Sequence, residues 1–153
     1  MRYIRMHGLV AGIAMFIAAN AHAQANKSAA SFDLTSTKVV IEKQNRALED
    51  VLARGDSIGA GSFYTMDAIL LPFKFGRAAI VKDVGEMVRD SITNVHLTLT
   101  NLSGDQNILI EDATLSIYYL NGKLAKAGSG ILVWKKVDGE WKIFREVWRF
   151  DKK

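Results

Sequence analysis

Two turn signals in the second half of the chain separate long stretches in which apolar and polar residues alternate. Asn121-Gly122 and Asp138-Gly139 are pairs favoured in two-residue hairpin loops, because both central residues of a type I′ turn need positive φ. The alternation around them has the two-residue period of β-strands. The pattern predicts four antiparallel strands. The first begins near Val95, and the second spans about Asn107–Tyr119. The third follows the first turn and ends at Val137, and the fourth spans about Glu140–Phe150.

The first half of the chain has the spacing of helices. A buried stripe of Ile41, Leu48 and Leu52 predicts a helix over about Thr35–Arg54. Three further elements are expected: a short helix that Asp56 or Ser57 caps and that carries Phe63 and Tyr64, a strand over Ala68–Pro72, and a helix over about Arg77–Ile92. Three helices cannot cover so long a sheet if it is flat. We therefore predict an α+β domain in which a strongly curved, mainly antiparallel sheet wraps around about three N-terminal helices.

The two hairpins also fix which side chains share a face of the sheet, if both loops have two residues. One face then carries Phe144 and Trp148, together with a row in which Asp112 and Glu146 lie two strands apart. The opposite face carries Glu111 and Arg145, which most simply form an ion pair. Both faces hold large apolar groups, so one covers the helices and the other needs a partner. A homodimer is the expected partner arrangement.

The N-terminus resembles a secretory signal peptide. Arg2 and Arg5 precede an apolar run of about 11 residues, and Ala21-His22-Ala23 is a typical cleavage pattern. We expect a signal peptide over residues 1–23, a flexible tail over 24–34 and one folded domain over 35–151. The expected location is outside the cytoplasm, in the periplasm if the host has two membranes.

Composition argues against several function classes. The chain has no cysteine, and cleavage after Ala23 leaves His96 as the one histidine, so a zinc site built on several of these ligands is excluded. No calcium-binding spacing, phosphate loop, integral membrane anchor or basic-aromatic pattern for nucleic acid is present. We expect no cofactor and no metal.

Two stretches resemble the nuclear-transport-factor-2-like superfamily. The first consists of Gly55-Asp56, Phe63–Pro72 and Gly76–Ile80. The second consists of Leu132–Ile143 and Val147-Trp148, and it resembles the SnoaL-like and ketosteroid-isomerase-like branch. The resemblance implies a cone-shaped sheet closed over helices and a dimer through the outer face. It also implies diverse roles, because some members isomerise or dehydrate small hydrophobic substrates while others bind ligands or only assemble.

The resemblance also suggests site residues. Tyr64 matches a position near the pocket, where its hydroxyl could donate to a ligand carbonyl, and Trp148 and Phe144 are the expected ligand-binding wall. The general base of ketosteroid isomerases precedes the proline that ends the first strand, but Leu70 and Leu71 stand there in this chain. Isomerisation of 5-ene-3-ketosteroids is therefore not expected.

Asp112 or Glu146 could replace the base if their face lines the cavity; on the outer face they are solvated acids. Tyr64 and Trp148 also have a plain reading as core residues. The first hypothesis is an exported protein that binds a small, mostly apolar molecule. The alternatives are an acid–base isomerase or lyase that uses Tyr64 with Asp112 or Glu146, and a homo-oligomeric interaction module.

Overall fold

The computed structural model describes residues 32–152. The predicted signal peptide and residues 24–31 of the predicted tail lie outside these residues. The helices are α1 (Leu34–Ala53), α2 (Ser57–Gly61) and α3 (Arg77–Arg89). The strands are β1 (Tyr64–Leu71), β2 (Lys74–Phe75), β3 (Ile92–Gly104), β4 (Ile108–Tyr119), β5 (Leu124–Val137) and β6 (Glu140–Phe150). Among the described residues, no helix is long and apolar enough to cross a membrane.

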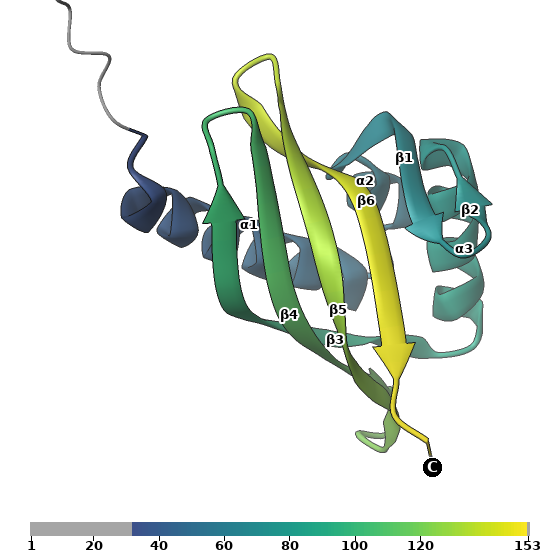
Figure 1. The fold of residues 1–153 in the computed structure, drawn as a ribbon. Coiled ribbons are helices and arrows are strands. Elements are labelled where there is room, and N and C mark those ends of the chain that lie inside the picture. Colours follow the sequence, from purple (N-terminus) through teal and green to yellow (C-terminus); the bar gives the residue numbers. More distant parts are fainter. Residues whose placement is uncertain (1–31, 153) are drawn as a thin grey trace, which may run out of the picture. The chain divides into compact units, whose positions relative to one another are not determined.

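The six strands form one curved, unclosed sheet in the order β2-β1-β6-β5-β4-β3. Strands β3 to β6 follow each other as antiparallel neighbours, and β1 joins the edge of β6 in parallel. The helices lie along one side of the sheet (Figure 1). The predicted α+β architecture, with the helices before the long strands, is confirmed.

Capping residues determine where α1 and α2 begin in the N-terminal half of the chain. The Asp33 side chain accepts a hydrogen bond from the backbone N–H of Ser36 at 3.1 Å, so α1 begins at Leu34, just before the predicted start. Asp56 caps α2 in the same way through Gly59, at 2.8 Å. The prediction that this short helix carries Phe63 and Tyr64 is wrong, because α2 ends at Gly61 and β1 begins at Tyr64 and pairs with β6.

The two hairpin signals form different loops. Asp138 and Gly139 have φ of 51° and 86°, so they form the predicted two-residue turn. In the other hairpin only Gly122 has positive φ, and the Tyr119 N–H donates to the Lys123 carbonyl across a longer loop. The register of β4 against β5 is nevertheless as predicted, with Asp112 opposite Ile131.

One extra residue in β6 changes the predicted faces. Trp134 pairs with Ile143 as expected, but Val133 pairs with Arg145, so Phe144 is an additional residue in a β-bulge. A shift of one residue moves every later side chain to the opposite face. Glu146 and Trp148 therefore lie on the face that covers the helices, in rows with Glu111 and Ala113. The predicted row of Asp112 with Glu146 is wrong.

The interior side of the sheet contains a second buried carboxyl group. Glu111 is fully buried and accepts hydrogen bonds from Asn45 Nδ2 at 2.6 Å and from Trp134 Nε1 at 2.7 Å. The expected ion pair between Glu111 and Arg145 is wrong, because the bulge turns Arg145 outward. Its guanidinium donates instead to the carbonyl oxygens of Asp67 and Phe144.

Candidate functional site

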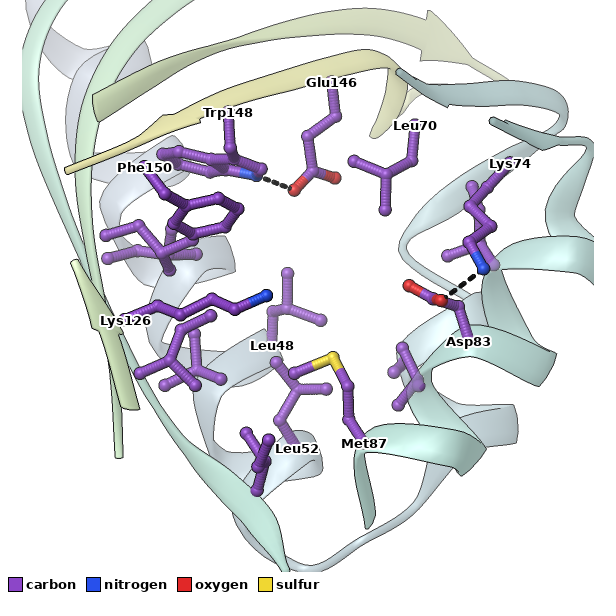
Figure 2. Close-up of a pocket in the computed structure, with 18 of the residues that line it drawn as sticks. Leu48, Leu52, Leu70, Lys74, Asp83, Met87, Lys126, Glu146, Trp148 and Phe150 are labelled. Carbon is purple, nitrogen blue, oxygen red and sulfur yellow. Dashed lines mark hydrogen bonds and ion pairs between the residues drawn. The ribbon is translucent and has the colours of Figure 1, made fainter. Parts of the chain in front are cut away.

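A cavity of about 430 Å³ lies between the helices and the concave face of the sheet. Its wall is mainly aliphatic. The apolar side chains of this wall come from the helices α1 and α3 and from the sheet. They are Leu48, Leu52, Leu70, Ile80, Val84, Met87, Val95, Leu97, Leu115 and Ile117. Figure 2 shows Leu48, Leu52, Leu70 and Met87 around an open centre, together with the polar groups of the lining. Such a wall suits a ligand with a large apolar surface.

Glu146 is the carboxyl group that β6 directs into this cavity. Its side chain is buried and takes one hydrogen bond on each oxygen. The Tyr64 hydroxyl donates to Oε2 at 2.7 Å, and the Trp148 indole N–H donates to Oε1 (Figure 2). Three of the predicted site residues therefore form one hydrogen-bonded group, which we call the Tyr64–Glu146–Trp148 group.

The position of Trp148 depends on a glycine. Gly130 is the partner of Trp148 in β5, and a methyl group at Gly130 would overlap the Trp148 ring and the carbonyl oxygen of Val147. The missing side chain lets the indole lie against β5.

Burial governs the protonation of the group. Desolvation raises the pKa of Glu146, the hydrogen bonds from Trp148 and Tyr64 oppose this rise, and the nearby Asp83 charge adds to it. Desolvation, followed by the charge of Glu146, also raises the pKa of Tyr64 well above its ordinary value, so Tyr64 stays a hydrogen-bond donor.

Two lysines complete the polar lining. Lys74 Nζ forms an ion pair with Asp83 Oδ1 at 2.5 Å on one wall. Lys126 Nζ lies 5.0 Å from the centre of the Phe150 ring, across the cavity from that pair (Figure 2). The exposed lining residues mark the mouth of the cavity; they are Leu71, Pro72, Phe73, Lys126 and Phe150.

Two predicted site residues lie elsewhere. Asp112 is on the outer face, where its Oδ2 accepts from Asn101 Nδ2 at 3.0 Å, so it cannot act in the cavity. Phe144 is also outside, because it occupies the bulge and packs under Lys135 and Arg145. Phe150 lines the cavity in its place.

Lys74, Asp83, Lys126 and Phe150 are lining residues that were not predicted from the sequence. A signal existed for Lys126, because it falls on the same alternate positions of β5 as Leu132 and Trp134. Asp83 is the neighbour of Val84, one of the buried residues of α3. No local sequence pattern indicated that Asp83 forms an ion pair with Lys74.

The fold and this buried polar group together define a class: an α+β protein with a curved sheet around a cavity. More specifically, the chain has the fold of the nuclear-transport-factor-2-like superfamily. No protein-family model and no curated protein sequence matches the chain. Solved structures with the same fold match at low sequence identity.

Three of these structures illustrate the likeness. An NTF-2 like protein of unknown function from Shewanella oneidensis MR-1 superposes with a TM-score of 0.64 and 15% identity, over 74% of this chain and 98% of that one. A ketosteroid isomerase-like protein from Erwinia carotovora atroseptica has a TM-score of 0.61 and 15% identity, over 75% and 96%. A protein of unknown function with a cystatin-like fold from Nostoc punctiforme has a TM-score of 0.66 and 15% identity, over 78% and 94%.

Replacement of Glu146 by Gln is expected to flatten the pH dependence of stability. A raised pKa means that the folded protein binds the proton more tightly than the unfolded chain does. Stability is therefore lost as the pH rises from the ordinary value of 4.5 through the folded pKa. Urea unfolding between pH 4.5 and 7 measures this loss, which should be smaller in Glu146→Gln than in the wild type.

Asp112→Asn is the matched control, because it removes a carboxyl group from the outer face of the same sheet. This variant should keep the wild-type slope. Parallel curves for wild type and Glu146→Gln would contradict the assignment of a buried, proton-holding carboxyl at Glu146.

Proposed function

We propose that this protein binds a small, mostly apolar ligand in the cavity beneath its curved sheet. The observation that carries the proposal is the cavity itself: about 430 Å³ with a predominantly aliphatic wall. Ligand sites in proteins typically have roughly 300–1,000 Å³ and are lined by apolar side chains with a few placed polar groups. When such a cavity contains no ligand, the side chains of its wall lack dispersion contacts on the side that faces it.

The polar groups of the cavity are compatible with an apolar occupant. Each Glu146 oxygen already has a donor, and the carboxyl group accepts the hydroxyl of Tyr64 and the indole N–H of Trp148. An apolar molecule beside the Tyr64–Glu146–Trp148 group therefore breaks no hydrogen bond. Buried polar groups that pair with each other avoid the desolvation penalty of unpaired ones.

A cavity-filling substitution tests the proposal. Met87 lies in the wall and is half-buried, so Met87→Trp should occupy ligand space with little loss of stability. We expect at least about tenfold weaker binding of the apolar probe 1-anilinonaphthalene-8-sulfonate, with a change in unfolding free energy below about 1 kcal/mol. Met66→Trp, at an exposed methionine outside the cavity, is the control and should bind as the wild type does.

Native mass spectrometry of protein exported by its own host supplies the companion measurement. Wild type should carry a bound small molecule that Met87→Trp lacks. The same spectra address the proposed export, for which the chain should begin at Gln24. Equal probe binding by wild type and Met87→Trp contradicts the ligand-binding proposal.

An acid–base isomerase or lyase is the second candidate, and one observation favours it. Glu146 is the register partner of Leu70, in the strand beside the position where ketosteroid isomerases are expected to carry their base. The cavity thus contains a buried carboxyl group close to the expected place, although from another strand. A carboxyl with a raised pKa is suited to proton transfer.

We nevertheless expect no isomerisation of a 5-ene-3-ketosteroid. The Tyr64 hydroxyl donates to Glu146, so it is not free to hold an enolate oxygen, and two donors on Glu146 lower its basicity. An absorbance assay of the conjugated product should give no turnover with wild type, Glu146→Gln or Asp112→Asn. Turnover that Glu146→Gln abolishes and Asp112→Asn retains would reverse the order of the two candidates.

We also propose that two copies associate through the outer face of the sheet. Ile110, Ile131 and Val147 lie there on adjacent strands and are each exposed by about two-fifths, at 43%, 42% and 39%. A contiguous apolar group on a sheet face typically marks an interface. The cavity on the other face supports the proposal of ligand binding in addition to assembly.

Light scattering tests the dimer. The wild type should have twice the mass of the chain, and Ile131→Lys should yield monomers, because two copies would bury opposing like charges. Val39→Lys replaces an exposed apolar residue of α1 and should leave the mass unchanged. A monomeric wild type at high micromolar concentration excludes the interface.

A further inference from the structure

We propose that the ligand is an amphiphile with an anionic head, a carboxylate on an apolar body, and that Lys126 at the mouth binds the head. The proposal rests on the proposed ligand-binding function and specifies the ligand class of the same cavity. It depends on which charges around the cavity already have a partner and which do not.

The acidic groups of the cavity are occupied by the protein's own donors. Glu146 takes hydrogen bonds from Tyr64 and Trp148, one on each oxygen. Asp83 is in contact with Lys74, whose Nζ lies 2.5 Å from Oδ1. A cationic ligand would have to compete with these bonds, so the cavity does not favour a cation.

Lys126 is different. Among residues 32–152 it forms no ion pair and no side-chain hydrogen bond, while it lines the cavity. Its Nζ lies 5.0 Å from the centre of the Phe150 ring. Figure 2 shows the Lys126 side chain extending over the aliphatic wall toward the open centre, on the side opposite the Lys74–Asp83 pair.

The fold accounts for this inward direction. Along β5 the inward positions are Trp134, Leu132, Gly130 and Gly128, and the next alternate position is Lys126. An inward lysine at the end of such a series keeps its aliphatic stem on the apolar wall and presents the ammonium group at the mouth. The two glycines add no side chain to this wall, and the Trp148 ring lies directly against Gly130.

A ligand in this site has its apolar body against the aliphatic wall and its carboxylate at Nζ. The head stays near solvent, since Lys126 is exposed, so neither charge is fully desolvated. An ion pair of this kind adds selectivity more than affinity, and dissolved salt screens it.

Isothermal titration calorimetry with matched pairs tests the inference. The pairs are decanoate against decanol, and naphthoate against naphthalenemethanol; each pair shares a body and differs in the head. The decanoate pair tests a ligand with a linear apolar body, and the naphthoate pair tests one with an aromatic body. Wild type should prefer the acid of the better-fitting pair by about fivefold, and added salt should reduce the preference.

Lys126→Met retains the stem and removes the charge, so it should abolish the preference and leave alcohol affinity within about twofold. Lys123→Met, in the adjacent hairpin but outside the cavity lining, should keep the wild-type preference. Equal affinity of wild type for acid and alcohol, or a preference that survives in Lys126→Met, overturns the inference while the binding function stands. Failure of all four compounds to bind overturns both.

Discussion

The bulge at Phe144 decides which side chains of the last strand reach the interior. Before it, Trp141 and Ile143 face the core; after it, Glu146, Trp148 and Phe150 do. Without the extra residue, Arg145 and Val147 would face the helices, and the cavity would contain an unpaired guanidinium in place of a hydrogen-bonded carboxyl. The bulge also gives the outer face Val147, which joins Ile110 and Ile131 in the exposed apolar group.

The buried carboxyls carry an electrostatic cost that neighbouring donors offset. Glu146 and Glu111 stand in one row across three strands, and each has two donors. Burial raises the pKa of Glu111, its two donors oppose the rise, and the charge of Glu146 adds to it. Two acids so placed repel each other when both are ionised, and a proton on either of them relieves this repulsion.

Much of the fold could be predicted from periodicity and turn chemistry. The limits of β6, the Asp138-Gly139 turn and the register of β4 against β5 follow from the alternation together with the two turn signals. The bulge could not be predicted, because Phe144 and Arg145 both suit a strand and nothing local identifies one of them as unpaired. That single residue separated Asp112 from Glu146 and exchanged Phe144 for Phe150 in the site. Tyr64 and Trp148 were found because the resemblance supplied positions that periodicity does not.

The deep wall and the mouth of the cavity make different demands on a ligand. In the deep wall, polar atoms satisfy each other, so contact there selects for size and apolar surface. At the mouth, Phe73 is 79% exposed, and Lys126 forms no ion pair or side-chain hydrogen bond within residues 32–152, so contact there selects for the chemistry of the head. A molecule that fills the interior but lacks a suitable head gains only the apolar part of the interaction. Discrimination among ligands of similar size must then come from the mouth, which is also the part that salt and surface charge can modulate.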